Sequence, residues 1–170
     1  MMHIPPRARA FTLIETMVAI AIFTLAIVGP FVAASRALTA AAVARDGLMA
    51  SGLAQEGLEI VRAERDQAYL AHQSDPLAYL GACIAPGRCV ADMSTLAASA
   101  CSSSCPALYV TGSGLYNQSG SGAPSLFTRT ISVARNPGGL ANAERATVTV
   151  TWTDHGAHTL TLTEDFYDWL

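Results

Sequence analysis

One uninterrupted apolar run near the N-terminus constrains this chain more than any other feature. No charged residue occurs over the 20 residues from Thr16 to Ser35, and Arg36 ends the run. A helix rises about 1.5 Å per residue, so such a stretch spans roughly 30 Å, which is the thickness of the hydrocarbon core of a bilayer. The run therefore predicts a membrane-spanning helix.

The residues before the run predict its orientation. Residues 1–10 carry Arg7 and Arg9 and no acid, and positive charge next to a span stays on the cytoplasmic side. Residues 36–170 are then sent outward. A secretory signal peptide would instead have an apolar region of about 7 to 15 residues followed by a small residue at the cleavage site. Here the small residue, Ala10, precedes the run, so we expect a single-pass protein whose C-terminal part lies outside.

An acid lies inside the apolar segment, where Glu15 follows Ile14. A charged side chain at the centre of a bilayer costs about 2.5 to 3.5 kcal/mol on insertion scales, so an acid in such a segment predicts a function. The alternative is an interfacial acid whose side chain reaches the headgroups.

The sequence around this acid resembles a known processing motif. Arg9-Ala10-Phe11-Thr12-Leu13-Ile14-Glu15, followed by an apolar helix, is similar to the prepilin cleavage and methylation motif of type IV pilins and type II secretion pseudopilins. The resemblance implies that a prepilin peptidase cuts between Ala10 and Phe11, that Phe11 is N-methylated, and that Glu15 acts in filament assembly. The family usually has Gly where this chain has Ala10. The implied partners are the prepilin peptidase, other pilin subunits and an inner-membrane assembly platform.

The helical pattern continues beyond the apolar run. Between Val32 and Asp66 the chain has no proline and is rich in Ala, Leu, Glu, Gln and Arg, which favour helix. We expect one helix from about residue 12 to about residue 66. Gly29 and Pro30 fall inside its apolar half and should bend or locally open it, because proline lacks an N–H and clashes with the preceding turn. A harmless kink is the alternative.

The C-terminal third has the pattern of β-strands. Apolar residues alternate with threonine over 147–153 and again over 159–163, which predicts a hairpin with one buried and one wet face. A third strand is expected around Phe127, Ile131 and Val133, and a fourth at 108–110. Residues 164–170 predict a last strand or an exposed tail.

Together these elements predict an α+β fold, with one long N-terminal helix packed on a C-terminal antiparallel sheet. This plan is similar to the pilin fold. The expected parts are a basic leader at 1–10, a transmembrane or filament-core half of the helix at 11–35, the second half at 36–66, an irregular cysteine-containing connection at 67–106, and the sheet at 107–170. A short helix is expected around 93–98 within the connection.

Four cysteines lie in that connection, at Cys83, Cys89, Cys101 and Cys105. Neither close pair has the C-x₂-C spacing of common zinc sites, so no metal is expected. An even count in an exported, loop-rich segment favours disulfides. Three pairings are possible, and the short loops favour Cys83–Cys89 and Cys101–Cys105.

Composition and motifs argue against several functions. The chain has no lysine, which excludes Schiff-base chemistry, a P-loop lysine and lysine isopeptide cross-links. Residues 11–170 hold eight arginines against thirteen acids, a net charge of −5, so no nucleic-acid partner is expected. There is no G-x-S-x-G, H-E-x-x-H or phosphate loop, and His155 and His158 predict turn and strand-end residues. We expect neither enzymatic activity nor a cofactor.

Two classes of function follow. The first is a structural subunit of a type IV pilus or related pseudopilus, held in the cytoplasmic (inner) membrane and then assembled into a surface pilus or periplasmic pseudopilus. The threonine-rich hairpin and the two cysteine loops favour a minor pilin. The alternative is a single-pass membrane-anchored extracytoplasmic binding domain or enzyme that does not assemble into filaments, in which Glu15 is incidental.

Overall fold

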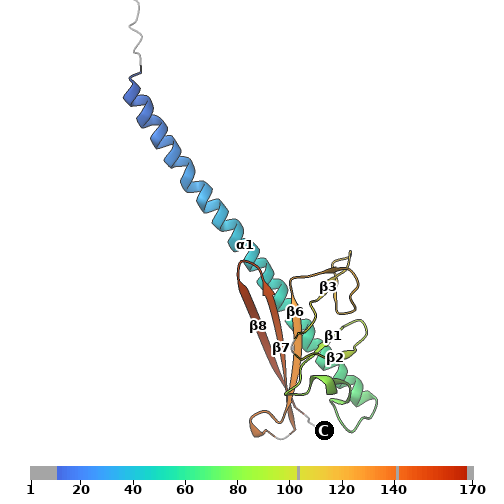
Figure 1. Ribbon diagram of the computed structural model, residues 1–170. Helices are drawn as coiled ribbons and strands as arrows, with labels where there is room; N and C mark the ends of the chain where they lie inside the picture. The colour runs from blue at the N-terminus through green and yellow to red at the C-terminus, as the bar shows by residue number, and fades with distance from the viewer. Residues whose placement is uncertain (1–10, 103, 141, 168–170) are drawn as a thin grey trace, which may run out of the picture. The chain divides into compact units, whose positions relative to one another are not determined.

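A computed structural model describes residues 11–102, 104–140 and 142–167 of the chain (Figure 1). The chain divides into two compact units inside its first helix, between Ala42 and Val43. The first unit, as far as it is described, is the apolar part of that helix. The second unit contains the rest of the helix and the β-strands.

Helix α1 runs from Leu13 to Leu70, so the predicted long helix is confirmed and extends one turn beyond its predicted end. Residues 67–70 suit a helix as well as the residues before them do. The helix stops where His72 takes a left-handed backbone conformation, with φ of 53°. The side chains buried in the second unit recur every three or four residues, as one face of a helix requires. They are Ala50, Leu53, Ala54, Gly57, Ile60, Val61, Glu64 and Ala68.

The main sheet of the described chain has five antiparallel strands in the order β2-β1-β6-β7-β8. Its three longer strands are β6 (Thr128–Arg135), β7 (Ala143–Thr153) and β8 (Ala157–Tyr167). The predicted hairpin is confirmed as β7 and β8, whose register places Val148 opposite Leu162 and Thr149 opposite Thr161. The predicted α+β layout of a long helix followed by an antiparallel sheet is therefore correct.

The hydrophobic core lies between the second half of α1 and the inward face of this sheet; in Figure 1 the helix runs alongside β6 and β7. Ile131, Val148 and Val150 point inward and are fully buried. Threonines alternate with them and face outward on β7. The helix approaches closely at Gly57, where an added Cβ would lie 2.7 Å from Cγ1 of Val148.

The fourth predicted strand is real but belongs to a different sheet. β3 (Tyr109–Val110) pairs with β4 (Tyr116–Asn117) and β5 (Ala123–Pro124) in a small three-stranded sheet. It does not extend the main sheet because β1 takes the free edge of β6, with Cys89 opposite Ile131.

The connection contains more regular structure than its composition suggests. It holds the 3₁₀ helix η1 (Ala78–Cys83) and the short strands β1 (Cys89–Ala91) and β2 (Ala98–Ala100). The predicted helix around 93–98 is wrong. The Asp92 carboxylate accepts the Ser94 N–H at 2.8 Å, and Leu96 has φ of 52°, so this segment turns back and enters β2. A second 3₁₀ turn, η2 (Pro137–Gly139), lies between β6 and β7.

The structure pairs Cys83 with Cys89 and Cys101 with Cys105, which is the pairing that the short loops favour. Cys83 and Cys89 are fully buried and join η1 to β1. Cys101 and Cys105 are partly exposed and close a loop just after β2. At the other end of the chain, β8 continues the hairpin to Tyr167, and residues 168–170 lie outside the described part.

Candidate assembly site and polar cluster of the folded domain

The start of α1 is defined by a side-chain cap. Thr12 precedes the first helical residue, Leu13, and its Oγ1 accepts the backbone N–H of Glu15 at 3.3 Å. Threonine in this position satisfies one of the N–H groups that have no partner inside a helix. The sequence carries a signal for this cap, because residues 12–15 have the Thr-x-x-Glu pattern of a capping box. Sequence interpretation missed it.

Phe11 and Thr12 precede the first helical residue, and the Thr12 carbonyl accepts the first helical hydrogen bond, from the N–H of Thr16 at 3.2 Å. Ala10, the other side of the predicted cleavage site, lies outside the described residues.

Glu15 occupies the first turn of α1, where a carboxylate interacts favourably with the positive end of the helix dipole. Its apolar neighbours are open to the surroundings, with Ile14 at 71% and Met17 at 63% exposure. Within this chain, therefore, Glu15 has an apolar environment that something outside the chain must cover. The role of Glu15 in filament assembly stays a prediction.

Among the described residues, α1 is the helix whose length and composition would allow it to cross a membrane, and none of its most apolar window is buried within the chain. Threonine hydroxyls in this part of α1 donate hydrogen bonds to backbone carbonyls of the same helix. Thr16 donates to the carbonyl of Leu13, and Thr24 to that of Ala21, at 2.8 and 2.9 Å. Hydroxyls satisfied in this way can be placed in hydrocarbon.

Gly29 and Pro30 lie inside α1, and the helix continues through them; the bend expected there stays a prediction. Residues 13–70 are helical without a break. Proline removes one backbone donor, and the helix on either side is long enough to continue through the position.

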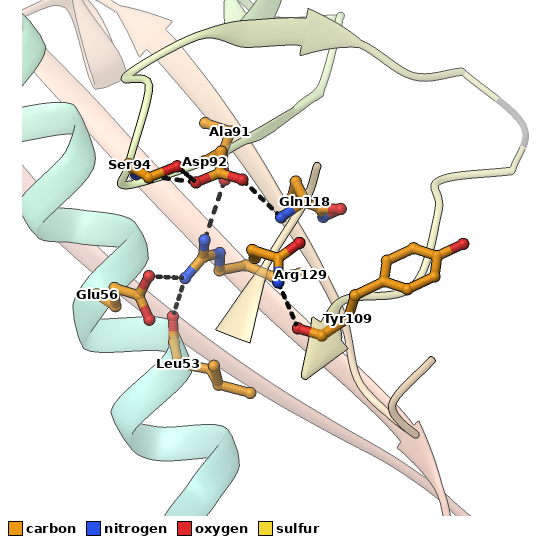
Figure 2. Close-up of polar contacts among 9 residues, drawn as sticks. Leu53, Glu56, Ala91, Asp92, Ser94, Tyr109, Gln118 and Arg129 are labelled. Atoms are coloured by element: carbon orange, nitrogen blue, oxygen red, sulfur yellow. Dashed lines mark hydrogen bonds and ion pairs between the residues drawn. The ribbon is translucent and has the colours of Figure 1, made fainter. Parts of the chain in front are cut away.

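A buried arginine is the main polar feature of the folded domain. Arg129 on β6 is 1% exposed, and its guanidinium donates to the Leu53 carbonyl of α1 at 3.2 Å and to the Ala91 carbonyl of β1 at 3.0 Å. Nη1 also lies 3.3 Å from Oε1 of Glu56. Figure 2 shows the guanidinium between the helix and the chain at Asp92. Arg129 therefore links its own strand, β6, to helix α1 and to strand β1.

Sequence interpretation missed this arginine, although a signal existed. Arg129 has the same parity along β6 as Ile131 and Val133, both of which are fully buried. Side chains on alternate residues of a strand share one face. The position of Arg129 in β6 therefore predicts that its charged side chain lies on the buried face.

Asp92 lies in the turn after β1 and joins it to the segment that follows β4. Its carboxylate accepts the N–H and the hydroxyl of Ser94 and the N–H of Gln118. Burial acts to raise the pKa of Asp92, but hydrogen bonds from Ser94, Gln118 and Ser119 outweigh it, and the pKa lies below its ordinary value. Asp92 is therefore ionised at neutral pH and anchors that segment by charge-assisted hydrogen bonds.

The two hairpin histidines have local partners. Nδ1 of His155 lies 2.8 Å from the Asp154 carboxylate, and the His158 ring stacks on Trp152 with centroids 5.2 Å apart. Nε2 of His158 also lies 3.0 Å from the Asp154 carbonyl oxygen, so both histidines contact Asp154. Among the described residues, no group of three or more His, Cys, Asp or Glu side chains is placed to hold a metal ion.

The N-terminal segment of the chain matches the model of a protein family. Residues 5–29 correspond to the prokaryotic N-terminal methylation motif, which is the leader of type IV pilins and pseudopilins. The matched segment includes Ala10, Phe11 and Glu15. No curated protein and no solved structure matches the chain. The motif and the apolar helix together support a type IV pilin-like protein.

Proposed function

We propose that this chain is a structural subunit, a minor pilin, of a type IV pilus or related pseudopilus, and that it is assembled through its N-terminal helix. The observation that carries the proposal is the methylation motif joined to an apolar helix with Glu15 in its first turn. The elements that follow supply a disulfide-containing domain with a packed core.

The proposed sequence of events begins in the cytoplasmic membrane. A prepilin peptidase removes residues 1–10 by cutting the Ala10–Phe11 bond, and the new amine of Phe11 is methylated. An assembly platform then moves the helix from lipid into a filament, where the helices of other pilin subunits replace the bilayer. The domain stays outside the membrane throughout.

Glu15 has a specific role in this scheme. The amine of Phe11 in one subunit and the Glu15 carboxylate of its neighbour carry opposite charges, and both enter a core of low dielectric constant. Pairing relieves the desolvation cost of each charge, whereas an unpaired Glu15 keeps its full cost. The pair therefore sets the register between subunits.

A minor role is proposed because the domain carries a long threonine-rich hairpin and two short disulfide loops rather than a plain repeating surface. Purified filaments in which this chain is the dominant protein would contradict the minor role without affecting the proposal of assembly.

The test is to replace Glu15 and follow three quantities in the native host. In Glu15→Leu we expect membrane abundance to be kept or raised and cleavage to continue, while incorporation into sheared filaments falls at least tenfold. Thr24→Val is the matched control, because it removes a polar group of the same helix that is satisfied locally. It should assemble normally.

If Glu15→Leu assembles as well as the wild-type chain, Glu15 is an interfacial acid and the alternative of a membrane-anchored domain outside filaments gains support. If the variant fails to reach the membrane, Glu15→Gln keeps the shape and a polar head and separates insertion from assembly.

A further inference from the structure

A pocket of about 530 Å³ lies on the folded domain between α1, the turn after β1 and the loop that joins β3 to β5. Glu56 contributes from the helix, and Asp92 and Met93 from the turn. Leu115, Tyr116 and Asn117 form the facing wall. This pocket is remote in sequence from the assembly segment and has no part in the function proposed above.

The walls are held by side chains that are already satisfied. Asn117 is buried, donates to the Ser121 carbonyl at 2.8 Å, and accepts from the Ser119 hydroxyl at 2.8 Å. The Ser94 hydroxyl donates to Asp92 at 2.7 Å. The loop is therefore shaped before any ligand arrives, and these groups have little hydrogen-bonding capacity left for one.

Two apolar side chains are displayed across the pocket instead of being buried. Leu115 is 68% exposed and Met93 is 46% exposed, although both belong to segments fixed by the hydrogen bonds of Asp92 and Asn117. Apolar side chains on preformed loops around a pocket with a few polar groups are the usual composition of a binding site.

The charge at the pocket is negative. The carboxylates of Glu56 and Asp92 lie on either side of the Arg129 guanidinium (Figure 2). Arg129 is buried behind them and is not part of the lining. Two carboxylates against one guanidinium leave one net negative charge, and Glu56, with 30% of its side chain exposed, presents it to the pocket.

These properties exclude most ligand classes. An anion would meet two carboxylates, and a sugar would find the Ser94 hydroxyl and the Asn117 amide already bonded within the loop. A purely apolar ligand would displace water from the exposed part of the Glu56 carboxylate and offer it no hydrogen bond, leaving the Arg129 guanidinium as its partner. An apolar stem with a cationic head satisfies the exposed Leu115 and Met93 as well as Glu56.

We propose that this pocket binds an arginine or lysine side chain, flanked by apolar residues, of a partner protein. The net charge of −5 over residues 11–170 adds long-range attraction for such a partner. The stem lies against Leu115 and Met93, and the head pairs with Glu56 while Asp92 holds the loop.

Binding can be measured on the full chain in lipid nanodiscs by NMR of methionine methyl groups. The probes are the peptide acetyl-Leu-Arg-Leu-amide and its citrulline counterpart, which has the same shape without the charge. The Met93 methyl signal should shift saturably with the arginine peptide, with an affinity at least about fivefold higher than for the citrulline peptide. The Met49 signal, which comes from outside the pocket, should not move.

Variants separate the two parts of the site. Glu56→Gln keeps an oxygen for Arg129 and should reduce the preference for arginine over citrulline to less than about twofold. Leu115→Ser, at an exposed position, should weaken both peptides alike. Glu59→Gln is the matched control, since Glu59 lies on the same helix outside the pocket and pairs with Arg62, and it should change neither.

Three results would overturn the proposal. They are equal binding of the two peptides, a preference for arginine that survives in Glu56→Gln, or binding of methylguanidinium alone as tight as that of the arginine peptide. The last result would show a simple cation site. Because the assay does not involve filaments, its failure would leave the assembly proposal untouched.

Discussion

Gly57 of α1 lies against Val148 of β7, so closely that a Cβ at Gly57 would be 2.7 Å from Cγ1 of Val148 and 3.2 Å from Cδ of Arg129. The contact sets the distance between the helix and the sheet. Gly57→Ala should therefore destabilise the domain by about 1 to 2 kcal/mol, because overpacking outweighs the better helix propensity of alanine. Thermal unfolding of the detergent-solubilised chain, followed by near-UV circular dichroism, measures the change.

The control for this substitution is Gly52→Ala in the same helix. Gly52 is exposed, and an added Cβ would meet nothing within 4 Å. Here only the better helix propensity of alanine acts, so the free energy of unfolding of the variant should rise by about 0.5 to 1 kcal/mol. Equal effects at the two positions would show that the close approach at Gly57 does not exist.

Arg129 should contribute more to stability than the exposed arginines. Arg129→Met removes the donors to the buried carbonyls of Leu53 and Ala91, and it leaves Glu56 without its partner. We expect a loss of about 2 to 4 kcal/mol. Arg145→Gln breaks an exposed pair with Asp165 that solvent screens, and should cost much less. Denaturant unfolding of both variants gives the comparison, and similar losses would refute the core role of Arg129.

The two disulfides should differ in their resistance to reduction. Cys83 and Cys89 are fully buried, whereas Cys101 and Cys105 are partly exposed. A reductant must reach a sulfur, so Cys101–Cys105 should open first under native conditions. Timed alkylation followed by peptide mapping reveals the order. All four cysteines should be oxidised at the start, and free thiols in the untreated protein would contradict the pairing.

Glu64 should make stability depend on pH. It is 3% exposed, and burial raises its pKa above the ordinary value. A raised pKa means that the folded state holds the proton more tightly, so this contribution to stability is complete at low pH and is lost as pH rises through the folded pKa. Glu64→Gln should therefore be more stable than wild type near neutral pH.

The advantage of Glu64→Gln should vanish below about pH 4, where the wild-type carboxyl is protonated in both states. Unfolding curves at several pH values test this. Glu59→Gln, at an exposed position that pairs with Arg62, should show no gain at any pH. A pH-independent gain in Glu64→Gln would rule out the titration of Glu64 as its cause.

The main architecture could be predicted because its signals are local and periodic. The uncharged run from Thr16 to Ser35 and the helix formers after it indicate α1, and threonine alternation indicates the β7–β8 hairpin. Strands β1 and β2 have three residues each. Such short segments have no period of their own, and they depend on pairing with β6 and on the Cys83–Cys89 disulfide.

The polar features were harder to predict. The turn at Asp92 depends on a side-chain hydrogen bond to Ser94 and on a loop some 26 residues away that donates through Gln118. No pattern within one segment contains that information. Thr12, in contrast, had a local signature in the capping box, and Arg129 could have been placed in the core by its parity with Ile131.

The mass of the native N-terminus tests the central claim most directly. The chain should be isolated from the membranes or filaments of its host, and its N-terminal peptide identified by mass spectrometry. Assembly through the processed helix predicts a peptide that begins at Phe11 with an N-methyl group and lacks residues 1–10. A native chain that keeps Met1 or Met2, or that is cut at a position other than Ala10–Phe11, would contradict the proposed function.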